Sequence, residues 1–280
     1  MAGASMNTIK TRIRSVESTM QITRAMELVA TSKLRRAKER AESIKPYMSA
    51  LLDTVGSIGG VCEQTTSPLL SSLSAGAKTL YIVIAGDRGL AGGYNSNIFK
   101  LAAKGDPDHS GLYIPIGKKS VDYFTRKGYS IFSSELAEAA EIGVGAAFTV
   151  AEKIINAILS GEIGEVKLIY TKFVSMLTQA PTKEQLLPLS DIGGGTGEPI
   201  YEGDTDALIA SVIKQYIGGV IYSAICESVA SECAARRSAM SSANKNAEEM
   251  ISDLRLKFNR ARQAVITQEI TEIVSGAEAL

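Results

Sequence analysis

Residues 30–58 read ATSKLRRAKERAESIKPYMSALLDTVGSI, and the spacing of their small and apolar members decides the fold of this chain. These members recur in alternating steps of four and three residues: Ala30, Leu34, Ala37, Ala41, Ile44, Met48, Leu51, Val55 and Ile58. A sustained seven-residue repeat predicts a helix that pairs with another helix in a left-handed supercoil. Pro46 lies inside the repeat, so we expect a kink or a loosened turn there.

The same helix is expected to extend back to the N-terminus, because no Gly or Pro occurs from Ala4 to Lys45. An earlier apolar run has the same spacing: Ile9, Ile13, Val16 and Met20. The apolar positions then shift to Ile22, Met26 and Val29. We therefore predict one N-terminal coiled-coil helix over residues 1–58.

A second long helix is predicted at the C-terminus, from about Asp206 to Ser275, since Gly and Pro are absent from Val220 to Ser275. Its seam again alternates steps of four and three: Ala247, Ile251, Leu254, Phe258, Ala261, Val265 and Gln268. We interpret Gly218-Gly219 as a close backbone contact with the middle of the chain, and a local kink in the helix is the alternative. Because both helices join that middle by their inner ends, residues 1–58 and 206–280 should form an antiparallel pair. The longer C-terminal helix should project beyond the N-terminus by roughly 20 Å.

The middle of the chain, residues 59–205, is typical of an α/β domain. Apolar runs rich in β-branched residues alternate with helical stretches; the expected strands are Leu80–Ala85, Leu112–Ile116 and Val166–Thr171, and the expected helices are Asn95–Ala103 and Gly145–Leu159. Such alternation predicts a mostly parallel sheet with right-handed crossovers. The predicted fold is thus a Rossmann-like α/β domain plus a long antiparallel two-helix coiled coil.

Charge and cysteine usage exclude several classes of protein. Thirty basic and thirty acidic residues cancel, so no overall field attracts nucleic acid or a membrane surface. Residues 1–45 are locally basic, with ten basic and four acidic side chains (10 − 4 = +6), which suits either a solvated helix face or a surface for an acidic partner. Cys62, Cys226 and Cys233 are odd in number and lack a C-x-x-C spacing, so we expect unreactive thiols in a reducing, intracellular setting. Since no run of 18 apolar residues occurs, we expect a chain that is soluble or at most peripheral to a membrane.

The candidate site is the glycine-rich turn Gly86-Asp87-Arg88-Gly89-Leu90-Ala91-Gly92-Gly93, which lies between a predicted strand and a predicted helix. Phosphate binds in such places, because free N–H groups at the helix start point toward it. The glycine spacing, however, fits neither the G-x-G-x-x-G fingerprint nor a P-loop with its Lys. Both a structural turn and a nucleotide site therefore stay open.

No other motif points to catalysis. His109 is the only histidine, so a metal centre or a histidine base has little to build on. We predict an interaction protein without catalytic residues, bound metal or cofactor.

Four separated stretches, in order, resemble the gamma subunit of F-type ATP synthases, the central stalk of that enzyme. They are residues 22–33 (ITRAMELVATSK), 87–93 (DRGLAGG), 231–236 (SECAAR) and 259–276 (NRARQAVITQEITEIVSG). The departures are Gly218-Gly219 in the last helix and Ala91, where relatives often carry Cys. The Cys pair that regulates chloroplast relatives is missing, and so is a transit peptide, which favours a bacterial enzyme.

The resemblance implies a rotary function. In this family the coiled coil occupies the centre of a hexamer of alpha and beta subunits, and the globular domain contacts the c-ring and the epsilon subunit. Ion flow turns ring and stalk together, and the stalk imposes different conformations on the catalytic sites, which belong to beta. The expected location is the cytoplasmic side of a bacterial cell membrane, with membrane contact only through the c-ring and no contact with nucleic acid. The coupling ion and the size of the c-ring are not encoded in this chain.

The resemblance also implies residue roles. Arg262 and Gln263 would contact an acidic catch on beta, and Lys33, Arg35 and Arg36 would lie near its acidic lever. Tyr201 and Glu202 match the region that meets the c-ring. Met26 matches a position where a new positive charge upsets coupling.

Two other functions remain as alternatives. A nucleotide-binding α/β protein or oxidoreductase would use the Gly86–Gly93 turn. A basic coiled-coil DNA-binding protein would use residues 10–45 and show a steep salt dependence of DNA affinity.

Overall fold

The computed structural model describes residues 2–62, 77–136, 138–189 and 205–278. In chain order the elements are α1 (Ala2–Ser43), α2 (Lys45–Cys62), β1 (Lys78–Ile84), α3 (Tyr94–Gly105), β2 (Leu112–Ile116), α4 (Lys118–Lys127), β3 (Ser130–Ile131), a 3-10 turn η1 (Ala139–Glu141), α5 (Val144–Leu159), β4 (Ile163–Phe173), β5 (Gln179–Leu187) and α6 (Thr205–Glu278). They form two compact units, Thr31–Arg236 and Met1–Ala30 with Arg237–Leu280, which we describe separately.

The first helix breaks where Pro46 predicts it. Helix α1 ends at Ser43 and α2 begins at Lys45, because Pro46 offers no N–H for a helical bond to the preceding turn. On both sides of the break the predicted seam faces inward: Ala37, Ala41, Ile44, Leu51 and Val55 are all buried. The seven-residue repeat therefore identified the packed face of both helices.

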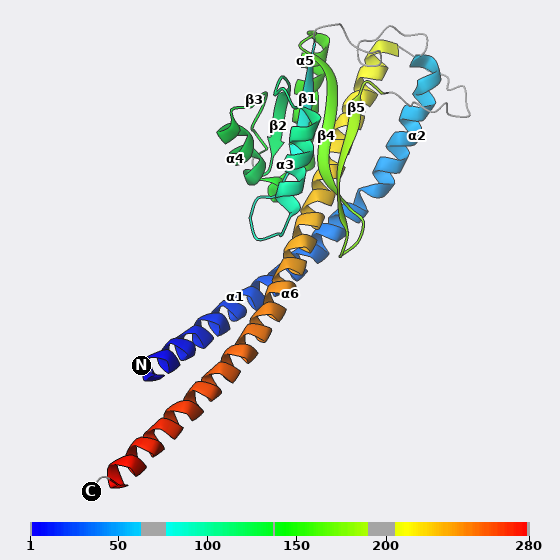
Figure 1. Ribbon diagram of the computed structural model, residues 1–280. Coiled ribbons are helices and arrows are strands. Elements are labelled where there is room, and N and C mark those ends of the chain that lie inside the picture. Colours follow the sequence, from blue (N-terminus) through cyan, green and yellow to red (C-terminus); the bar gives the residue numbers. More distant parts are fainter. Residues whose placement is uncertain (1, 63–76, 137, 190–204, 279–280) are drawn as a thin grey trace. The chain divides into compact units, whose positions relative to one another are not determined.

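Within the Thr31–Arg236 unit, a five-stranded sheet with the order β3-β2-β1-β4-β5 forms the centre (Figure 1). The pairs β3-β2, β2-β1 and β1-β4 are parallel, and only β5 runs antiparallel to its neighbour. This confirms the mostly parallel sheet. The sequence patterns missed β5 because it is an edge strand with a largely polar, partly exposed sequence around Pro181.

Helices cover both faces of this sheet. Helices α5 and α6 pack on the face that holds Leu80, Ile82 and Ile114. Helices α3 and α4 cover the face with Tyr81, Val83 and Tyr113. Successive strand residues thus enter opposite cores, as the two-residue period of a strand requires.

One glycine of the pair in α6 has the predicted role, and the other approaches the N-terminal segment. A Cβ on Gly218 would lie 2.7 Å from the ring of Phe148 in α5. One on Gly219 would lie 3.1 Å from side-chain atoms of both Tyr47 and Leu51 in α2. The two glycines let α6 approach the domain on one side and α2 on the other.

In the unit Met1–Ala30 with Arg237–Leu280, the N-terminal part of α1 runs antiparallel to the C-terminal part of α6. Arg24 pairs with Glu248 at 2.9 Å, and Glu17 pairs with Arg255 at 3.0 Å, so rising numbers in one helix meet falling numbers in the other. Ile251 and Leu254 are buried in the predicted seam. All described side chains from Ile266 onward are exposed, as expected for a tip that outlasts its partner helix. Gln268 is among them, so the predicted seam ends before this residue.

One part of the predicted seam is wrong. Ile22 and Val29 are 60% and 56% exposed, and Thr23 and Glu27 face the partner helix in their place. The buried amide of Asn244 accepts a hydrogen bond from the Thr23 hydroxyl (2.5 Å) and donates one to the Glu27 carboxylate (2.7 Å). Polar groups that form hydrogen bonds with one another can occupy a helix seam. A prediction based on apolar residues alone was therefore wrong at these positions.

Candidate functional site

Asp87 ties the glycine-rich turn to two neighbouring elements. Its carboxylate accepts backbone hydrogen bonds from Lys118 (3.2 Å) at the start of α4, and from Ala139 (2.9 Å) and Ala140 (3.0 Å) in η1. The carboxyl group thus supplies acceptors to backbone donors that would otherwise lack partners. These hydrogen bonds hold the turn after β1 against the start of α4 and against η1.

Helix α6 covers the same turn. Glu232, only 5% exposed, accepts hydrogen bonds from the Arg88 N–H (3.3 Å) and from the Arg236 guanidinium (2.5 Å). Arg236 also donates to the Gly89 carbonyl at 3.2 Å. A Cβ on Gly86 would lie 2.7 Å from the Glu232 carboxyl group, so a larger residue there would require that carboxyl group to move.

This arrangement bears on the nucleotide-binding alternative. In open parallel sheets, ligands bind outside the carboxyl ends of the strands, beside the turn after β1. Here the Glu232 carboxylate lies against that turn. The Asn95 amide oxygen accepts a hydrogen bond from the Gly86 N–H (2.9 Å). Tyr94 donates to the Ser228 carbonyl (2.9 Å) and so also joins the turn to α6. The N–H groups of Gly86 and Arg88, which a phosphate group would need, are thus already bound to protein acceptors.

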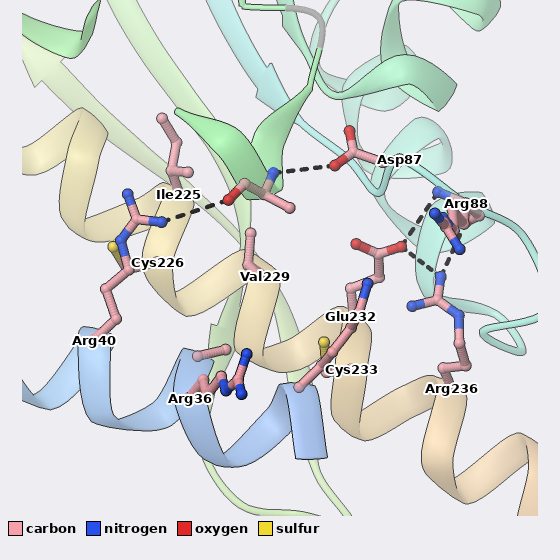
Figure 2. A pocket seen from close by; sticks show the side chains of 13 residues that line it. Arg36, Arg40, Asp87, Arg88, Ile225, Cys226, Val229, Glu232, Cys233 and Arg236 are labelled. Carbon is pink, nitrogen blue, oxygen red and sulfur yellow. Dashed lines mark hydrogen bonds and ion pairs between the residues drawn. The ribbon is translucent and has the colours of Figure 1, made fainter. Parts of the chain in front are cut away.

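A cavity of about 290 Å³ lies beside the turn, between α1, η1 and α6 (Figure 2). Apolar side chains line part of it, and five cationic residues contribute to its wall: Lys33, Arg36, Arg40, Arg88 and Arg236. Arg40 is already engaged, since it donates to the Tyr222 hydroxyl (2.8 Å) and to the Ile142 carbonyl. Within the described ranges no ion pair uses Lys33 or Arg36.

The other predicted contact residues are dispersed. Arg35 is exposed and lies 3.9 Å from Glu39, away from the cavity lining. Met26 is half-buried, and Arg262 and Gln263 are exposed, all in the unit Met1–Ala30 with Arg237–Leu280. Gly89, Gly92 and Gly93 are exposed parts of the turn. Tyr201 and Glu202 lie outside the described residues.

Comparison with known proteins identifies the family. A sequence profile described as ATP synthase matches residues 5–280. The ATP synthase gamma chain of Ruminococcus albus is 45% identical over 282 residues, which cover 98% of each chain. That of Desulforamulus reducens is 41% identical over 283 residues, 99% of each chain.

The chain belongs to the ATP synthase gamma chain family. The fold of this gamma-family chain also matches that of solved structures. A chain of the Euglena gracilis mitochondrial ATP synthase, solved as OSCP/F1/c-ring, aligns with a TM-score of 0.65 at 16% identity, over 99% of this chain and 95% of that one. A chain of the Tetrahymena thermophila central stalk/c-ring structure aligns with a TM-score of 0.59 at 23% identity, over 79% and 99%.

Among the described residues, no cluster of three His, Cys, Asp or Glu could hold a metal ion. In the same residues, no helix is both long and apolar enough to cross a bilayer.

Motif reasoning on this gamma-family chain missed the buried partners of the turn. Glu232 and Arg236 lie in the stretch 231–236 that resembles the family, and Arg40 is one of ten basic residues in segment 1–45, but neither pattern indicates a role beside the turn. The spacing of Glu232 and Arg236, four residues apart on one helix, suits an ion pair. Their burial depends on the Gly86 turn, which is remote in sequence, so their role required the tertiary structure.

The buried thiols of this gamma-family chain should react slowly. Burial raises the pKa of Cys226 and, aided by the Glu232 charge, raises the pKa of Cys233 from 9.0 to about 11. A higher pKa means less thiolate, which is the reactive form, and two pKa units leave roughly 100-fold less of it at pH 7–8. In a variant with Cys62→Ser and Cys226→Ser, which keeps only Cys233, maleimide labelling should be roughly 100-fold slower in the folded chain than in denaturant. Equal rates would contradict the burial of Cys233.

Proposed function

We infer from family membership that this chain is a subunit of an ATP synthase and serves as its central rotary stalk. The observation that carries this conclusion is the family match over residues 5–280 of a chain that has an α/β domain in one unit and an antiparallel pair of terminal helices in the other. The nucleotide-binding alternative is not favoured, because Glu232 lies against the turn that it would use.

The proposed role divides the chain into three segments. Residues 1–58 and 206–280 form the coiled coil inside a hexamer of alpha and beta subunits, and residues 59–205 form the domain that meets epsilon and the c-ring. Ion flow through the membrane turns the ring and this chain together, and the catalytic sites lie on beta. The proposed location is the cytoplasmic side of a bacterial cell membrane, which this chain contacts only through the c-ring.

The proposed contacts with beta are electrostatic. Arg262 and Gln263 face an acidic catch on beta, and Lys33, Arg35 and Arg36 face its acidic lever. Exposed ion pairs contribute roughly 0.2–1 kcal/mol each. Such small energies favour certain rotational positions of the stalk without preventing its rotation. Tyr201 and Glu202 are proposed to meet the c-ring.

Met26→Lys should lower the number of protons pumped per ATP hydrolysed while leaving the fold intact. Met26 is half-buried, so a lysine stem can occupy its place while the ammonium group reaches solvent and adds a charge to the rotor surface. Proton pumping and ATP hydrolysis would be measured together in vesicles that contain the reconstituted enzyme. Met26→Leu is the control, and an unchanged ratio for the lysine variant would refute the prediction.

Co-expression with alpha and beta subunits from the same source tests the function itself. We expect one copy of this chain per three alpha–beta pairs by native mass determination, and ATP hydrolysis that depends on its presence. Failure to assemble, with all subunits individually folded, would contradict the stalk role.

A further inference from the structure

The cavity beside the glycine-rich turn has a floor that is apolar apart from Glu232. The apolar side chains of this floor come from α1 and α6: Ala37, Ile225, Cys226, Val229 and Cys233. All of them are buried except Val229, which is half-buried. Burial raises the pKa of both thiols, so they carry no charge at pH 7. A floor of this kind favours an apolar ligand surface over a hydrated ion.

The charged residues that line the cavity give it an excess of positive charge. Five of them are cationic and two are carboxylates, a net charge of 5 − 2 = +3. Both carboxylates already accept hydrogen bonds from the protein. Asp87 binds three backbone N–H groups, and Glu232 binds the Arg236 guanidinium and the Arg88 N–H. The excess charge therefore belongs to cations, and it favours an anionic ligand.

Three of the five cations carry that excess. Arg40 and Arg236 donate to protein acceptors, whereas no ion pair in the described part of the chain uses Lys33, Arg36 or Arg88. All three are exposed, so they lie at the mouth of the cavity and not in its floor. Figure 2 shows Arg36 on α1 and Arg88 on the turn after β1, so these cations reach the mouth from two separate elements.

The volume of the cavity limits the size of the ligand. A dry apolar cavity of about 150 Å³ accepts benzene. The cavity beside the turn has about 290 Å³, which suits an apolar body of about twice that size. Two fused aromatic rings meet this requirement, and their faces can also stack on a guanidinium group.

We propose that this cavity binds a small organic carboxylate whose apolar body is about the size of naphthalene. The apolar body covers Ile225 and Val229 in the floor. The carboxylate stays at the mouth, where it accepts charge-assisted hydrogen bonds from Arg36 and is attracted by Lys33 and Arg88. Inorganic phosphate fits less well, because it would leave the apolar floor uncovered.

Ligand-observed NMR titration of the full chain tests this proposal with 2-naphthoate as the probe. We expect saturable binding with a Kd on the order of 0.1–1 mM, as is typical of a ligand with about 13 non-hydrogen atoms. Naphthylmethylammonium has the same rings and the opposite charge, so it should bind at least about tenfold more weakly. Equal affinities of the two ions, or no saturable binding of naphthoate, would overturn the proposal.

Two variants of neighbouring residues test whether the probe binds in this cavity. Arg36→Gln should weaken naphthoate binding about tenfold, because a charge-assisted hydrogen bond is lost. Arg35→Gln is the matched control, since Arg35 is equally exposed on α1 but lies outside the cavity lining, 3.9 Å from Glu39. The control should change the affinity by less than about twofold. Equal effects of the two substitutions would exclude this cavity as the binding site.

Both variants should keep the fold, because the substituted side chains are exposed, and equal helix content by circular dichroism checks this. The titration uses this chain without other subunits, so the proposed contact of Lys33 and Arg36 with beta cannot block the cavity. The result is therefore independent of the stalk role: failure of naphthoate to bind leaves that role intact, and failure to assemble with alpha and beta leaves the ligand site intact.

Discussion

Gly117→Ala is expected to lower the free energy of unfolding by on the order of 4 kcal/mol, or to prevent folding altogether. Gly117 joins β2 to α4 with φ +91°, where a side chain is strained. A Cβ there would lie 2.2 Å from the Ala85 carbonyl oxygen, which is backbone at the end of β1 and cannot rotate away. Relief would require moving β1 or β2, and with them the Asp87 contacts to α4 and η1.

Denaturant titration of the full-length chain, followed by circular dichroism, measures this effect. Gly128→Ala is the matched control, because Gly128 also has a positive φ (+74°) but no atom within 4 Å of its ideal Cβ. That variant should lose only about 1–2 kcal/mol, the cost of a left-handed conformation. Similar losses in both variants would mean that the clash with Ala85 is relieved cheaply.

Glu232→Ala should destabilise the chain by roughly 3 kcal/mol. The ion pair of Glu232 with Arg236 is largely buried, with side-chain exposures of 6% and 12%. Removing the carboxylate leaves a guanidinium group in a poorly solvated place, with only the carbonyls of Arg88 and Gly89 as partners. The Arg88 N–H also loses its acceptor.

Two further variants separate the charge from the packing. Glu232→Met combined with Arg236→Met should be less destabilising than Glu232→Ala, because no uncompensated charge stays buried. Glu39→Ala removes an exposed partner of Arg35 and should change stability by less than about 0.5 kcal/mol. If Glu232→Ala behaves like Glu39→Ala in thermal unfolding, the buried pair is not a structural determinant of the turn.

The spacing of residues was enough to predict the long terminal helices, the helices α3 and α5, and the central strands of the sheet. The residues spaced by four or three from Ala30 to Val55 lie on the inner face of a helix, as predicted, because helix periodicity is a local property of the backbone. The alternation of β-branched runs with helical stretches likewise predicted parallel strands. The short strand β3, the polar edge strand β5 and the helix α4 carry weaker local signals and were missed.

The candidate site was only half visible in the sequence. Its glycine spacing marks the turn after β1, because glycine is needed wherever backbone and neighbour approach closely. The neighbour itself, Glu232, lies in a helix 146 residues later (232 − 86). The local sequence around Gly86 does not predict this contact.

By itself, therefore, the sequence determined the two long helices, the parallel α/β domain and the family, since these depend on local periodicity and on contiguous matching residues. Only the tertiary structure decided that Thr23 and Glu27 take the place of Ile22 and Val29 in the helix seam. It also decided that Glu232 closes the glycine-rich turn. The physical reason is the same in each case: a buried polar group or an exposed apolar one is defined by partners that are distant in sequence.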